Sequence, residues 1–152
     1  MAFSLLLSIL AAAIGWMLSG CSGGNAKEHH IGVVQCSSDP WRWATNDEIE
    51  RELLFHDNAT VEIRSADDDA DQQINDIRYF LDKDIDLLIV NPVDADKVTP
   101  AIKEAFDRGI PVVTFDRRVN GDCYTAHIEV DNSQIGKEAG EYAISLLPRE
   151  AQ

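Results

Sequence analysis

The residue types best suited to chemistry cluster in two short segments of the chain. One segment holds Asp39, Trp41 and Arg42, and the other holds the adjacent pair Asp116 and Arg117. Carboxylate and guanidinium groups form strong hydrogen bonds with polar ligands, and an indole offers a flat apolar face. A sugar ring carries hydroxyls at its rim and C–H groups on its faces. This set of side chains therefore favours a monosaccharide or a related small polyol as ligand.

Structural roles for the same side chains remain open at this point. Trp41 or Trp43 could instead pack in the core, because tryptophan is a mostly buried residue type. Asp116 and Arg117 could pair with each other rather than with a ligand.

Catalytic and metal-binding motifs are absent from the sequence. None of the histidines is expected near the carboxyl end of a strand, so surface or structural roles are favoured over catalysis. The run Asp67–Asp69 lacks the spaced ligands of a calcium loop and fits an acidic helix start. Cys36 and Cys123 form no Cys-x-x-Cys motif; a disulfide between them is possible, but unpaired or buried thiols are the expectation. We therefore predict a non-enzymatic protein without a metal; the histidines are His29, His30, His56 and His127.

Nucleotide cofactors are disfavoured as well. The segment from Cys36 to Pro40, expected to follow the first strand, contains no glycine, whereas phosphate-binding loops depend on glycine. A phosphoacceptor receiver domain would need an aspartate where this chain has Asn91. The sequence predicts no cofactor.

The charge of the chain limits its partners. The formal net charge is -14, and none of the first 26 residues has a charged side chain. Binding to phosphate backbones depends on lysine and arginine, so nucleic acid is excluded as a partner.

Hydrophobic patterning predicts strands that alternate with helices. Helix 41–56 is expected to face inward through Ile49, Leu53 and Leu54. Strands linked by helices form right-handed crossovers, which give a doubly wound, mostly parallel α/β sheet. Ligands of such sheets bind outside the carboxyl ends of the strands. The segments that hold Trp41 and Asp116 both fall at such strand ends. The predicted strands are 31–34, 59–64, 86–90, 111–115 and 126–130, and the other helices are 67–82, 94–108 and 133–147.

The amino-terminal residues form a separate unit. An apolar run from Phe3 to Leu18 precedes Ser19-Gly20-Cys21, which resembles a bacterial lipobox, although a basic residue after Met1 is missing. Residues 1–21 are thus predicted to be an export signal with Cys21 as the lipidation site; the alternative is an uncleaved apolar anchor. Residues 22–30 read as a flexible tether. Both alternatives predict a periplasmic, membrane-anchored protein.

Three motifs give the chain a family resemblance. Asn91–Asp94, Gly109–Arg117 and Val130–Asn132 resemble segments of the ribose/galactose-type periplasmic binding proteins (type 1), in the same order. The resemblance implies a flavodoxin-like first lobe over 31–130 and a first crossing at 131–152, with the second lobe cut short. It also implies that Asp116 and Arg117 hold sugar hydroxyls, and that Asp131 and Asn132 are hinge residues.

The loop after the first strand refines this resemblance. Asp39 and Trp41 match the family's loop in role, while Arg42 replaces an aromatic residue and suggests a more polar or acidic sugar. The segment from Cys36 to Arg42 is also similar to the sugar-sensing periplasmic domains of hybrid two-component regulators of Bacteroidetes. The resemblance leaves import through a transporter permease and signalling to a sensor kinase both open.

Two further expectations concern the chain on its own. With half of the binding contacts missing, we expect weak or no sugar affinity, and we expect exposed apolar surface to favour a homodimer or other self-association. The alternative function is the effector-binding core of a LacI-type transcription regulator, which shares the fold. A missing basic helix-turn-helix argues against it.

Overall fold

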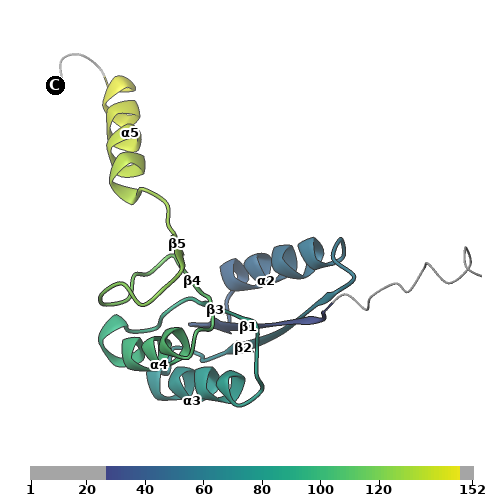
Figure 1. The fold of residues 1–152 in the computed structure, drawn as a ribbon. Coiled ribbons are helices and arrows are strands. Elements are labelled where there is room, and N and C mark those ends of the chain that lie inside the picture. Colours follow the sequence, from purple (N-terminus) through teal and green to yellow (C-terminus); the bar gives the residue numbers. More distant parts are fainter. Residues whose placement is uncertain (1–26, 148–152) are drawn as a thin grey trace, which may run out of the picture.

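The computed structural model describes residues 27–147, and these form a five-stranded sheet with helices on both faces (Figure 1). The predicted export segment and Cys21 lie outside the described residues. The elements are β1 (His29–Gln35), α2 (Pro40–Leu53), β2 (Ala59–Ser65), α3 (Ala70–Leu81), β3 (Leu87–Val90), α4 (Ala95–Asp107), β4 (Val112–Phe115), β5 (Ala126–Ile128) and α5 (Asn132–Ser145).

The sheet has the strand order β2-β1-β3-β4-β5, and all of its pairs are parallel. This is the flavodoxin-like order, so the predicted doubly wound α/β class is confirmed. The order reverses between β1 and β3, and the crevice outside their carboxyl ends is where such sheets bind ligands. β1 begins at His29, so His29 and His30 belong to the sheet and not to the predicted tether.

Each described helix begins at an aspartate that caps it. Asp39 accepts a hydrogen bond from the Arg42 backbone N–H, and Asp94 and Asp131 cap α4 and α5 in the same way. Such caps satisfy backbone donors that have no partner inside the helix. Asp69 caps α3, so the acidic run does lie at a helix start. The helix itself begins three residues later than predicted, at Ala70.

One face of the sheet carries the closed core, which we call the α3/α4 face. Alternate residues of β3 and β4 pack there against α3 and α4, and the largest contributors are essentially inaccessible to solvent. A Cβ atom at Gly32 would lie 2.7 Å from the Phe80 ring, so only glycine allows α3 to approach β1 this closely. The central side chains are Val34, Ile77, Phe80, Leu88, Val90, Ile102 and Val112.

The opposite face, which we call the α2 face, is covered by α2 alone among the described elements (Figure 1). Val33 is buried beneath α2, but Ile89 and Phe115, farther along the sheet, are only half-buried. The prediction that Leu54 faces inward from α2 is wrong. The helix ends at Leu53, and Leu54 is its exposed C-cap.

α5 stands apart from the sheet, joined to β5 by residues 129–131 (Figure 1). None of its residues, all of which are described, is buried. Within residues 27–147, no helix is long and apolar enough to cross a membrane. Cys36 and Cys123 are free in this part of the chain, and both are buried, as predicted.

Candidate functional site

The carboxyl ends of β1, β3 and β4 bring together polar residues that are distant in the sequence. Each strand is followed by one or more of them: Cys36 to Asp39 after β1, Asn91 after β3 and Asp116 after β4. Asp116 has a left-handed backbone with φ of 66°, a conformation that aspartate tolerates better than most residues. The turn directs its carboxylate toward α2, because Asp116 pairs with Arg42 of that helix.

Arg42 is the centre of this network. Its guanidinium donates to Asp116 Oδ2 at 2.8 Å and to Cys36 Sγ at 3.3 Å. The amide of Asn91, with its oxygen turned toward Arg42, accepts from Nη2 at 3.1 Å. Burial opposes the charge of Arg42, but the hydrogen bonds to Cys36 and Asp116 outweigh it, so the pKa of Arg42 is raised. The positive charge is thus fixed beneath the site and neutralised by Asp116.

Asp39 serves chiefly as a structural residue in this arrangement. Its carboxylate accepts from Ser37 Oγ at 2.7 Å and from the Arg42 backbone N–H at 3.0 Å. The hydrogen bond from Ser37 and then that from Arg42 lower the pKa of Asp39. Asp39 therefore holds the start of α2, which sets the positions of Trp41 and Arg42.

Arg117 turns away from its neighbour. Its Nη1 donates to the carbonyl oxygens of Pro92 at 3.3 Å and Val93 at 3.1 Å. The alternative in which Arg117 pairs with Asp116 is therefore wrong, because Asp116 pairs with Arg42. Arg117 instead connects the end of β4 to the loop after β3.

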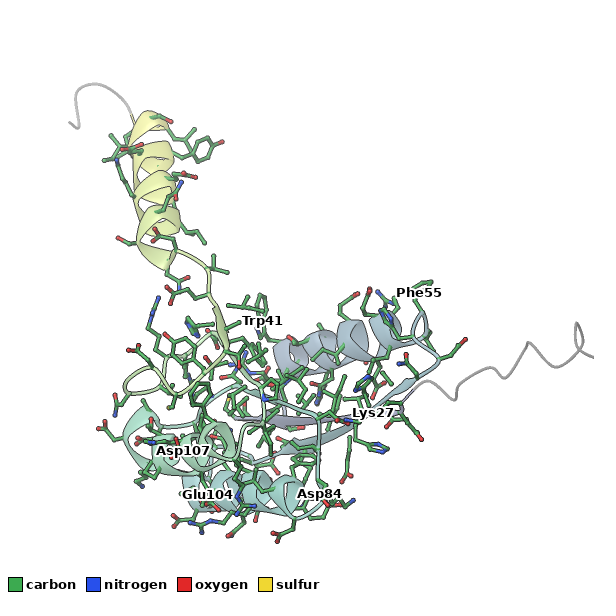
Figure 2. The ribbon with its side chains drawn as sticks, viewed as in Figure 1. Lys27, Trp41, Phe55, Asp84, Glu104 and Asp107 are labelled. Carbon is green, nitrogen blue, oxygen red and sulfur yellow. The ribbon has the colours of Figure 1, made fainter. Side chains whose placement is uncertain are left out.

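Both tryptophans near the start of α2 are exposed, so the core-packing alternative is wrong. Trp41 is 71% exposed and Trp43 is 54% exposed. Trp43 Nε1 donates to Ser38 Oγ at 3.1 Å, which ties it to the loop before the helix. Trp41 lies at the end of α2 nearer to α5, while Phe55 lies at the far end (Figure 2).

A cavity of about 320 Å³ opens between the start of α2, the ends of β4 and β5, and the start of α5. It brings together two of the predicted ligand residues, Trp41 and Asp116, along with Asn132 of the predicted hinge. Asp39, Arg42 and Arg117 do not line it. The other side chains that line it, most of them apolar, were not predicted as site residues: Thr45, Phe115, Ile128, Glu129, Val130 and Ile135.

A somewhat larger cavity, of about 400 Å³, lies at the other end of the strands, beside the end of α3. Two of its charged groups, Glu62 and Lys83, already pair with each other, and Glu62 also accepts a hydrogen bond from Tyr79. The first cavity is the better candidate site, because the exposed Trp41 borders it and Asp116 connects it to the polar network around Arg42.

His127 lies between a threonine and a glutamate. His127 Nδ1 lies 2.9 Å from Thr114 Oγ1, and its Nε2 lies 3.2 Å from Glu129 Oε2. This geometry resembles that of a catalytic triad, with a hydroxyl, a base and an acid. Thr114, however, is fully buried, so its hydroxyl cannot reach a substrate. In the described part of the chain, no three His, Cys, Asp or Glu residues are grouped so as to hold a metal ion.

Comparison with known proteins identifies the family of this chain. The family model described as "Periplasmic binding protein domain" matches residues 31–152. The chain belongs to this family. The fructose binding periplasmic domain of a hybrid two component system is 47% identical and superposes with a TM-score of 0.73, over 78% of this chain and 39% of that one.

Curated members of the periplasmic binding protein family match at lower identity. The D-xylose-binding periplasmic protein of Haemophilus influenzae is 26% identical over 93% of this chain and 42% of its own length. The ribose import binding protein of Bacillus subtilis is 25% identical over 96% of this chain and 52% of its own length. The chain thus spans about half the length of these relatives, or less.

Proposed function

We propose that this chain recognises a monosaccharide or a related small polyol as part of a periplasmic solute-binding protein. The observation that carries the proposal is the cavity at the carboxyl ends of β4 and β5, where Trp41 and Asp116 lie together. An exposed indole can stack on the C–H face of a sugar ring, and a carboxylate can accept from its hydroxyls. No step of this function requires catalysis.

The side chains take different parts in this proposal. Trp41 and Asp116 contact the sugar, and Arg42 and Asp39 support them from beneath. Arg117 does not line the cavity, and in this proposal it contacts the sugar only at the edge of the site, with its guanidinium held by the loop after β3. Asp131 and Asn132 form the hinge; Asp131 caps α5 through a hydrogen bond from the Gln134 backbone N–H at 2.9 Å.

Sensing is favoured over delivery to an importer. The relative with 47% identity is a domain of a hybrid two component system, whereas the xylose- and ribose-binding relatives are 25–26% identical. In this proposal the domain acts outside the cytoplasm and passes its signal to a kinase.

The domain is held at the membrane by its amino terminus in this proposal, with Cys21 as the lipidated residue. Incorporation of labelled fatty acid that is lost in Cys21→Ser would support the anchor, and incorporation that persists would contradict lipidation at Cys21.

The sugar-binding proposal is tested by NMR titration of the chain with D-fructose, D-ribose and D-xylose. NMR detects millimolar binding. This range suits the weak affinity expected of a chain that spans only part of the length of its relatives. One sugar should shift the indole signal of Trp41, and Asp116→Asn should weaken this response about tenfold or more, as expected for the loss of a charged hydrogen bond.

A matched control is available at Asp84. Like Asp116, it has a left-handed backbone, with φ of 51°, but it lies on an exposed turn at another part of the molecule (Figure 2). Asp84→Asn should leave the titration unchanged. If no sugar shifts Trp41 in the folded chain, or if both variants weaken binding equally, the cavity is not the sugar site.

A further inference from the structure

A fully buried polar side chain on α3 supports the site without contacting its cavity. Gln73 has no exposed surface, yet most of the other buried residues of its helix are apolar. Burying an amide costs free energy unless its hydrogen bonds are satisfied. Gln73 satisfies them on one loop only: Nε2 donates to the Asn91 carbonyl at 2.8 Å, and Oε1 accepts from the Val93 N–H at 2.7 Å.

These two hydrogen bonds hold both sides of Pro92. Proline has no backbone N–H, so the segment cannot extend the sheet ladder beyond Asn91. The Gln73 amide takes the place of a neighbouring strand, because it offers one donor and one acceptor to the backbone. The direction of the carbonyl groups in this loop is therefore set by a side chain from α3.

The same loop supports both charged groups that follow β4. The carbonyls of Pro92 and Val93 accept from Arg117 Nη1, and the Asn91 side chain contacts the guanidinium of Arg42. Arg42 in turn holds Asp116. A displacement of the loop would thus reach Asp116 and Arg117 by two separate routes.

We propose that Gln73 is a positioning residue for ligand binding, which orients Arg117 and Asp116 by fixing the loop Asn91–Val93. The inference rests on the proposed sugar-binding function for its purpose, but its structural step is independent of any ligand. Gln73 does not touch the ligand in this proposal.

The test compares Gln73→Met with two controls in the whole chain. Methionine has a similar length but neither donates nor accepts strongly. Gln72→Met makes the same change at the preceding residue of α3, which is exposed and donates to Asp76. Ile77→Ala removes a buried side chain from the same helix and controls for lost stability.

Two NMR signals report on the loop without any ligand. In Gln73→Met, the Val93 amide should exchange with solvent at least about tenfold faster than in the wild type, which corresponds to ~1.4 kcal/mol. The side-chain Nε–H signal of Arg117 should shift. Neither control should move the Arg117 signal, even though Ile77→Ala lowers the midpoint of urea unfolding.

A second variant keeps the test decisive if Gln73→Met does not fold. Gln73→Glu keeps the acceptor for Val93 but loses the donor to Asn91. Val93 should then stay protected, while the Arg117 signal still shifts. An unchanged Arg117 signal in a folded Gln73 variant, or an equal shift in Ile77→Ala, overturns the proposal.

Titration with D-fructose separates this proposal from the proposed function. If the wild type responds, Gln73→Met should bind at least about tenfold more weakly, whereas Gln72→Met binds normally. If the wild type responds but Gln73→Met binds equally well, the positioning role is overturned. If D-fructose, D-ribose and D-xylose all leave the wild type unchanged while the Arg117 signal still depends on Gln73, the sugar-binding function fails, and only the role of Gln73 in fixing the loop Asn91–Val93 remains.

Discussion

The two faces of the sheet use the same strands but reach different degrees of burial. Leu88 and Val112 point to the α3/α4 face and have no exposed surface. Their neighbours Leu87 and Val113 point to the α2 face and are half-buried, while Ile128 on β5 is 63% exposed. The closed face therefore holds the strands in place, whereas the open face borders the candidate site.

The largest expected effect comes from adjacent leucines on opposite faces. Leu88→Ala should lower the free energy of unfolding by about 2–5 kcal/mol, because it leaves a cavity in a closed core. Leu87→Ala should cost less than half as much, since Leu87 is already partly solvated. Urea unfolding measures both changes, and equal losses would show that the two faces contribute alike.

A smaller effect is expected from glycine substitutions that add the same methyl group. Gly32→Ala should destabilise the fold by about 1–3 kcal/mol, because the new Cβ would meet the Phe80 ring at 2.7 Å. In α5, Gly140→Ala meets nothing within 4 Å and should raise helicity without lowering the unfolding midpoint. Circular dichroism and thermal unfolding record both. A loss of stability in Gly140→Ala would mean that α5 packs against another surface.

The open face should also make the chain self-associate. Ile128 and Ile135 are exposed on β5 and α5, and both line the cavity. Exposed apolar surface of this kind favours association, so we expect a concentration-dependent rise in mass by analytical ultracentrifugation. Ile128→Ser should reduce association severalfold, whereas Leu54→Ser at the far end of α2 should change it little. A monomer at all concentrations would contradict this prediction.

The smallest effect expected is a dependence on acidic pH. Hydrogen bonds from Ser37 and from the Arg42 backbone lower the pKa of Asp39, so its ionised form stabilises the folded chain. This stability is present above the unfolded pKa, near 3.8, and is lost as the pH falls through the lower folded value. Asp39→Asn keeps a capping residue but cannot titrate, so its stability should fall less steeply below about pH 4. Identical acid unfolding curves would contradict this role.

Much of the fold could be predicted from the sequence because it depends on local patterns. Apolar strands alternating with amphipathic helices require crossovers, and those crossovers require a parallel sheet. The bounds of the helices follow less directly from such patterns. The helix predicted from Asp67 begins at Ala70, because Asp67 and Asp68 take left-handed backbone conformations. The spacing of Leu54 predicts that it faces inward, but α2 ends one residue earlier, at Leu53.

The candidate site was predicted in part. The types and loop positions of Trp41 and Asp116 pointed to the cavity that they line. Asp39 was expected to contact the ligand, but its spacing to Arg42 also matches an N-cap, which is how the structure uses it. Phe115 and Ile128 were missed as site residues, because apolar residues of strands are normally assigned to the core.

The sequence by itself determined the α/β class, the parallel sheet and the placement of the polar residues at its carboxyl edge. All of these follow from periodicity and chain direction. Only the tertiary structure decided which polar groups pair: Asp116 with Arg42, 74 residues away, and Arg117 with the loop after β3. Such pairings depend on the angles and distances between separate elements, and local sequence patterns do not determine these.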